Sequence, residues 1–471
     1  MKREATFYFG MLGAAAAGIA AVLHWGTQLP VSPLSVGMVD AKVAEATGNR
    51  PVWESMANLL GSNFHHPLSQ LFVQLIVVIA VAQGMGRLFR ACGQPSVVGE
   101  MAAGILLGPS LLGMVAKGAF AFIFPAESLG SLKLLSQIGV CLFMFTVGME
   151  LDAGHLRHKA RTAVIVSHAS IVVPYLLGVL LAYFLFTSLA QPGTTFTAFS
   201  LFMGISMSIT AFPVLARILQ ERNLSRTYLG STAIACAAVD DVTAWSLLAF
   251  VVAIVRAGSL AACALNLALV ALFVAVMMWV IRPGLPRWLG REQLEADEPT
   301  KGVLAVVMCV VVASALCTEV IGIHALFGAF LAGAIMPETG NFRHKLAVRV
   351  ENFSTVLLLP LFFAFTGLRT QIGLLNDVQG WLICLGIIAV ATVGKLGGTA
   401  ITARVTGMSW RDSLQLGALM NTRGLMELIA LNIGYDLGIL SPRIFTMLVL
   451  MALVTTALTG PLLSRFQRMR S

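Results

Sequence analysis

Long apolar stretches separated by short polar or charged segments follow one another along the whole chain. Each stretch is about twenty residues long, which is the length an α-helix needs to cross a bilayer. The pattern predicts an all-α polytopic membrane protein with about 13–14 transmembrane helices. The predicted spans are residues 6–24, 69–87, 95–113, 131–150, 161–187, 196–219, 227–256, 261–282, 302–318, 321–336, 350–368, 379–404, 412–434 and 443–465.

Composition agrees with this interpretation and excludes an ordinary soluble domain. Of the 471 residues, 58% are hydrophobic and only 11% are charged, whereas soluble domains carry about 25% charged residues. The seven cysteines form no CxxC pair and no metal-ligand spacing. We therefore expect neither disulfides nor a bound metal cluster, and no cofactor.

The distribution of basic residues predicts the orientation. Of the 31 Lys and Arg residues, 22 fall in loops on the side of the N-terminus, seven on the opposite side and two within spans. Because basic loops stay in the cytoplasm, both termini are predicted to be cytoplasmic. The net charge of +9 is then a consequence of topology, and no nucleic-acid partner is expected.

The first 66 residues differ from the remainder. The span 6–24 is followed by a long outside loop, 25–66, before the next span. We interpret residues 1–66 as an additional transmembrane helix with its loop, and residues 67–471 as the main membrane domain. A cleaved signal peptide is the alternative, although no clear small-residue cleavage site follows the apolar stretch.

Two pairs of segments predict an internal repeat. Residues 142–149 (LFMFTVGM) resemble 361–368 (LFFAFTGL), and residues 103–109 (AGILLGP) resemble 329–337 (AFLAGAIMP). The members of each pair run in opposite directions in the predicted topology. This relation is typical of secondary transporters, and it predicts inverted repeats at about 95–282 and 302–466.

Two adjacent acids, Asp240 and Asp241, lie near the middle of the span 227–256. A charge at this depth is costly, so it needs a partner, a cavity or a function. Neighbouring residues on a helix point about 100° apart, so the two carboxylates meet different surroundings. One can contact a packed helix while the other faces a cavity and exchanges a proton for a cation. A structural ion pair is the alternative.

Lys395, within the span 379–404, is the predicted counter-ion of one aspartate. A purely structural salt bridge would place the same residues together. Both interpretations can hold, since a lysine that loses its partner when a cation binds can release its own proton.

Two spans contain residues that predict broken helices. Pro213 lies inside the span 196–219 and removes a backbone donor, which would leave carbonyl groups and the hydroxyls of Ser208 and Thr210 as oxygen ligands for a cation. An ordinary proline kink is the alternative. In the span 412–434, the segment Asn421, Thr422, Arg423, Gly424, Leu425, Met426, Glu427 predicts a second broken helix, or else a local Arg–Glu pair at i, i+4 spacing.

No phosphate-binding loop, HExxH or GxSxG motif is present. These absences argue against ATP-driven transport and against the common hydrolases, and we do not expect an enzyme. Energy would have to come from an ion gradient.

Taken together, QPSVVGE at 94–100, GILLGP at 104–109, ITAFPVLAR at 209–217, Asp240-Asp241, PLFF at 360–363 and NTRGLME at 421–427 resemble the monovalent cation:proton antiporter family, most closely its cation/proton exchanger branch. The resemblance covers about residues 69–466. It implies an inverted-repeat fold with a dimerisation domain, a mobile core domain and two crossed discontinuous helices.

The resemblance also implies residue roles. Asp241 would carry the cation and the proton in turn, Lys395 would pair with Asp240, and the Asp-Asp pair would make the exchange electrogenic. We therefore expect a homodimeric antiporter of Na⁺ or K⁺ against H⁺, working by alternating access in the inner (plasma) membrane. A channel-like potassium efflux protein without obligatory proton coupling is the alternative.

Overall fold

The structure is a computed structural model that describes residues 63–64, 66–150, 160–224, 227–256, 260–290, 294–295 and 299–467. The predicted span 6–24 lies outside the described residues, as does nearly all of the loop 25–66. Among the described residues, 11 helices are long and apolar enough to cross a membrane, beginning with Pro67–Ala91 and ending with Pro442–Gln467. The predicted all-α polytopic fold is confirmed.

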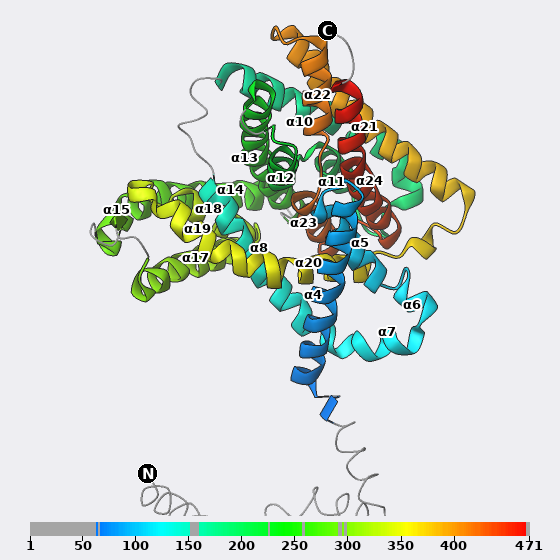
Figure 1. Cartoon of the computed structure of the whole chain (residues 1–471), viewed down its shortest axis with the longest axis horizontal. Coiled ribbons are helices and arrows are strands. Elements are labelled where there is room, and N and C mark those ends of the chain that lie inside the picture. The colour runs from blue at the N-terminus through cyan, green and yellow to red at the C-terminus, as the bar shows by residue number, and fades with distance from the viewer. Residues whose placement is uncertain are drawn as a thin grey trace, which may run out of the picture. The chain divides into compact units, whose positions relative to one another are not determined.

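The described helices follow the predicted spans closely (Figure 1). Their bounds are α4 Pro67–Ala91, α5 Ser96–Leu107, α6 Leu112–Val115, α7 Lys117–Ile123, α8 Leu129–Glu150, α10 Ala160–Leu189, α11 Phe196–Ser208, α12 Phe212–Glu221, α13 Tyr228–Arg256, α14 Leu260–Val276, α15 Arg282–Leu289, α17 Lys301–Ile321, α18 Ala325–Ala334, α19 Phe342–Phe353, α20 Leu359–Arg369, α21 Val378–Val405, α22 Trp410–Met420, α23 Leu425–Asp436 and α24 Pro442–Gln467.

One predicted span forms a shorter helix than expected, and the break predicted in the span 412–434 is present. The span 321–336 forms only the ten-residue helix α18. Gly322 ends α17 in the left-handed conformation, with φ 96°, and His324 has φ 85°, so the helix cannot begin before Ala325. The span 412–434 is divided into α22 and α23, with four residues between them.

The helices form two groups by their packing. The first, called here the core group, contains α10, α11, α12, α13, α21, α22, α23 and α24. The second, called the scaffold group, contains α4, α5, α8, α17, α18, α19 and α20. Helix α14 contacts both α13 and α17 and so connects the two groups.

Within the scaffold group, the segments predicted to be repeats pack crosswise. Helix α5 crosses α20 where Gly104 faces Gly367, and α8 crosses α18 where Gly148 faces Gly333. A Cβ atom on any of these four glycines would collide with a backbone carbonyl of the facing helix. Small residues permit such close backbone approach in membrane bundles. In the predicted repeats, α5 corresponds to α18 and α20 corresponds to α8. The crossing of α5 with α20 is therefore the counterpart of the crossing of α18 with α8.

Candidate functional site

Two helices of the core group are interrupted at the same level and touch there. Helix α11 ends at Ser208 and α12 begins at Phe212, with Pro213 in its first turn. Helix α22 ends at Met420 and α23 begins at Leu425. The Ala211 N–H donates to the Thr422 carbonyl at 3.0 Å, so the two extended segments cross and share a backbone hydrogen bond.

Helix breaks inside a membrane leave backbone carbonyls that need donors. Arg423 supplies two of them, because Nη1 donates to the Ser206 carbonyl and Nη2 to the Met207 carbonyl, each at 2.6 Å. The Lys395 ammonium donates to the Ser208 carbonyl. Both cations thus lie at the C-terminus of α11, where the helix dipole is negative.

The segment between α22 and α23 is held from several sides. Arg423 Nη1 lies 3.2 Å from Glu427 Oε2, in the first turn of α23. The Thr456 hydroxyl of α24 accepts a hydrogen bond from the Arg423 N–H and donates one to the Arg423 carbonyl. At Gly424, a Cβ atom would lie 2.9 Å from Val214 Cγ2, which explains the glycine at this position. Arg423 and Glu427 are completely buried.

Asp240 is completely buried and has four polar side chains around it. Ser167 and Thr210 each donate to its carboxylate at 2.5 Å, and Ser170 donates at 3.0 Å. Lys395 Nζ lies 3.1 Å from Asp240 Oδ2. This set of donors satisfies the carboxylate and fixes it in the packed interface between α10, α13 and α21.

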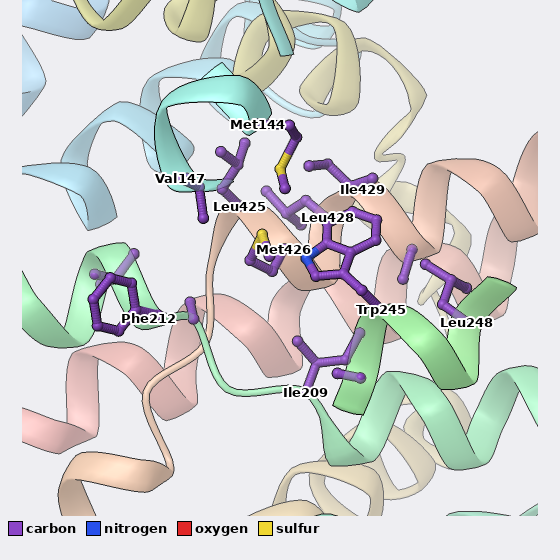
Figure 2. Packing of buried hydrophobic residues seen from close by; sticks show 14 of the residues in the cluster. Met144, Val147, Ile209, Phe212, Trp245, Leu248, Leu425, Met426, Leu428 and Ile429 are labelled. Carbon is purple, nitrogen blue, oxygen red and sulfur yellow. The ribbon is translucent and has the colours of Figure 1, made fainter. Parts of the chain in front are cut away.

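Asp241 is also completely buried but lies in different surroundings. It lines a cavity of about 10 Å³ together with Ile209, Ala244, Trp245, Leu248 and Met426. Figure 2 shows the apolar side chains on this side of α13 and α23. A cavity of this size has room for about one water molecule. The two neighbouring acids therefore occupy a polar, packed site and a small, mostly apolar one.

Not every residue predicted as a ligand faces this cavity. The Ser208 hydroxyl donates to the Ile205 carbonyl at 3.0 Å, and the Thr210 hydroxyl is taken up by Asp240 and the Met420 carbonyl. Neither lines the Asp241 cavity. Asn421 is completely buried, and both atoms of its side-chain amide have no hydrogen-bond partner among the described residues.

A larger cavity opens between the scaffold and core groups on the side of α12. This cavity, called here the vestibule, has a volume of about 330 Å³ and includes Pro213, Arg217 and Gln220 of α12, Thr146 of α8 and Leu425 of α23. On the side of α23, the gap between the groups holds a cavity of only about 30 Å³, called here the opposite cavity. The cavity on the side of α12 is thus much the larger of the two.

Ionic contacts join the two groups beside the opposite cavity. Arg369 of α20 donates to Asn432 Oδ1 at 2.8 Å and to Asp436 Oδ1 at 2.6 Å. Lys133 of α8 lies 3.4 Å from Asp436 Oδ2. The Arg369 guanidinium also lies 4.9 Å from the centre of the Tyr435 ring. Helix α23 is therefore tied to two scaffold helices at this end.

Three residues of the site were not predicted from the sequence. Ser167 and Ser170 lie one turn apart in the apolar span 161–187, and this spacing is the signal that would have identified them. Trp245 follows Asp241 by four residues and so lies on the same helix face. That Trp245 lines the Asp241 cavity is visible only in the tertiary structure.

The comparisons with known proteins all indicate the same family. The family model described as "Sodium/hydrogen exchanger, transmembrane" matches residues 75–468. The Na⁺/H⁺ antiporter NhaS4 of Synechocystis sp. is 43% identical over 393 residues, which cover 83% of this chain and 96% of that protein. The K⁺/H⁺ antiporter 1 of Saccharomyces cerevisiae is 31% identical and covers 86% of this chain.

Length differs among the relatives. The chain spans about half of the yeast protein, 48%, and half of the cation/H⁺ antiporter 20 of Arabidopsis thaliana, 50%, to which it is 40% identical over 88% of its own length. Among solved structures, the sodium proton antiporter MjNhaP1 of Methanocaldococcus jannaschii matches with a TM-score of 0.58 at 13% identity, covering 85% of this chain and 98% of that one. This likeness confirms the antiporter fold.

Proposed function

The chain belongs to the sodium/hydrogen exchanger family, and we propose that it exchanges a monovalent cation, Na⁺ or K⁺, for protons, with Asp241 as the site that both occupy in turn. The observation that carries this proposal is the difference between the two neighbouring acids. Asp240 is saturated by Ser167, Ser170, Thr210 and Lys395, whereas Asp241 lines a cavity. A single carboxylate that holds either ion couples the two fluxes.

We propose that access alternates by movement of the core group against the scaffold group. The 330 Å³ vestibule and the 30 Å³ opposite cavity support this, since they lie in the same gap on opposite sides of the crossing. In the predicted orientation the vestibule faces the cytoplasm. The Ala211–Thr422 hydrogen bond would let the crossed segments move together as one unit.

Electrogenic exchange follows if Lys395 takes part. A cation that disturbs the Asp240–Lys395 pair would release a proton from the ammonium as well as from Asp241, so net charge would move.

We retain the remaining expectations as proposals. These are inverted repeats at about 95–282 and 302–466, a homodimer, an inner (plasma) membrane location and cytoplasmic termini.

The proposal is tested with the full chain in proteoliposomes that contain a pH-sensitive dye. Addition of NaCl or KCl should move protons in the wild type, and Asp241→Asn should abolish the movement while its melting temperature in detergent stays near that of the wild type. Glu338→Gln, which removes a partly exposed ion pair to Arg343, is the matched control and should retain activity.

Other outcomes of the same assay would contradict the proposal. Cation flux without proton movement would favour the channel-like alternative. Full activity in Asp241→Asn would exclude this residue as the carrier. Activity measured with the membrane potential clamped or free separates electrogenic from electroneutral exchange.

A further inference from the structure

The vestibule and the Asp241 cavity are separate, although they lie on the two sides of one helix turn. Leu425 lines the vestibule and Met426 lines the Asp241 cavity. Among the described residues, none lines both cavities. The first turn of α23 therefore forms part of the barrier that an ion from the vestibule must pass to reach Asp241. Figure 2 shows Leu425 and Met426 among the buried apolar side chains near the start of α23.

The barrier and the cavity wall are apolar. Apart from the carboxylate, the lining side chains are Ile209, Ala244, Trp245, Leu248 and Met426, all buried. A cavity of about 10 Å³ admits one water molecule but not a cation with its full hydration shell. An ion must therefore lose nearly all its water before it contacts Asp241, and apolar constrictions of this kind oppose hydrated ions.

Trp245 supplies a single polar atom in this apolar wall. It lies one helical turn from Asp241 and is 4% exposed, and its indole Nε1 has no hydrogen-bond partner among the described residues. An indole N–H can only donate, so it suits the oxygen atom of one water molecule. The ring is held by Phe327 at 5.1 Å and Phe330 at 6.2 Å between centroids, both from α18 of the scaffold group.

Met426 closes the same space with a different kind of side chain. Methionine is unbranched and has three rotatable bonds, so it can turn aside without a backbone change. The β-branched Ile209 on the facing wall lacks this freedom. Met426 is thus the lining residue whose rotation most readily changes the size of the cavity.

From these observations we propose that Met426 and Trp245 together form a size and hydration filter over Asp241. Met426 limits the radius of the cation, and the Trp245 N–H holds the one water molecule that accompanies it. This inference rests on the proposed function, because it assumes that Asp241 binds the cation.

The test is the selectivity series Li⁺, Na⁺, K⁺ and Rb⁺ in the proteoliposome assay, expressed for each variant as the ratio of half-saturating concentrations. In Met426→Ala the ratio of Rb⁺ to Na⁺ should fall by about tenfold, because a larger pocket no longer discriminates by size. Met426→Leu, which nearly conserves volume, should leave the ratio unchanged. In Trp245→Phe, which keeps the ring and removes the N–H, apparent affinity for Li⁺ and Na⁺ should fall by about fivefold more than that for Rb⁺.

A ratio taken within one variant does not depend on how much protein is folded, so a merely structural role would not change it. Unchanged ratios in both Met426→Ala and Trp245→Phe would overturn the filter. If Met426→Ala does not fold, Trp245→Phe alone decides the outcome. Failure of the proposed function has a different signature, namely absent proton coupling in the wild type or activity that survives Asp241→Asn.

Discussion

Lys395 Nζ lies 3.1 Å from Asp240 Oδ2, and both side chains are completely buried. The two residues come from α21 and α13, which belong to different predicted repeats. Their contact, together with the hydrogen bonds from Ser167, Ser170 and Thr210, neutralises one of two adjacent acids. Asp241 lines a small cavity elsewhere, so the two neighbouring acids lie in different surroundings.

The first prediction concerns that pair. Lys395→Met should destabilise the protein by about 3–5 kcal/mol, because it leaves the Asp240 charge buried without its cation. The double variant Asp240→Asn with Lys395→Met removes both charges and should recover most of the loss. Thermal unfolding in detergent measures both effects. If Lys395→Met is as stable as the wild type, the Asp240–Lys395 pair does not contribute this free energy to stability.

The second prediction concerns the crossing of α5 and α20. Gly367→Ala should lower the yield of folded protein and its melting temperature, because the new Cβ would collide with the Gly104 carbonyl. Gly386→Ala in α21 is the control, since no atom lies within 4 Å of the position that a Cβ would take there. It should be neutral or slightly stabilising, because alanine is the better helix former. Equal effects of the two substitutions would contradict the proposed backbone contact.

The third prediction concerns Arg423. Arg423→Lys keeps the positive charge but loses the planar fork that reaches the Ser206 and Met207 carbonyls together. At least one buried carbonyl loses its donor, at a cost of about 1–3 kcal/mol, and transport should fall with stability. The exposed Arg87→Lys in α4 is the control and should change stability by less than about 0.5 kcal/mol.

The fourth prediction concerns the ionic contacts beside the opposite cavity. Asp436→Asn keeps the shape of the side chain but weakens the contacts to Arg369 and Lys133. These partly exposed pairs contribute little to stability, but they join the core group to the scaffold. We therefore expect faster labelling of Ser136→Cys, which lines the opposite cavity, in a background without the seven native cysteines.

Glu338→Gln is the control for this labelling experiment, because its ion pair to Arg343 lies within the scaffold side of the structure. It should leave the labelling rate unchanged. The same rate in Asp436→Asn and in the background would show that these contacts do not hold the gap closed.

The fifth prediction is a pH dependence of stability. The hydrogen bond and charge of Arg443 lower the pKa of Asp377, which precedes α21. A carboxylate whose pKa is lower in the folded state stabilises that state above its unfolded pKa and loses this contribution as the pH falls through the folded value. The difference in melting temperature between wild type and Asp377→Asn should therefore be present at neutral pH and be lost as the pH falls from the usual aspartate pKa of about 3.9 through the lower pKa of the folded state.

Several features of this protein could be predicted from residues close together in the sequence. Span length and apolar composition determine the all-α membrane fold, because a bilayer leaves the backbone no other partner than itself. Pro213 marks the break after α11, because proline lacks a donor. The adjacency of Asp240 and Asp241 indicates two unlike environments, because neighbours on a helix point in different directions.

The family resemblance implied that Lys395 pairs with Asp240, but only the tertiary structure shows the other partners of this acid. Ser167, Ser170 and Lys395 come from helices far from Asp240 in the sequence, and no local pattern shows that they gather on it and not on Asp241. The crosswise packing of Gly104 with Gly367 likewise depends on how the repeats fold together. The sequence alone predicted charged residues and broken helices near the middle of the spans, because the cost of a buried charge and the effect of a proline depend on nearby residues. Long-range packing decided which residues contact them.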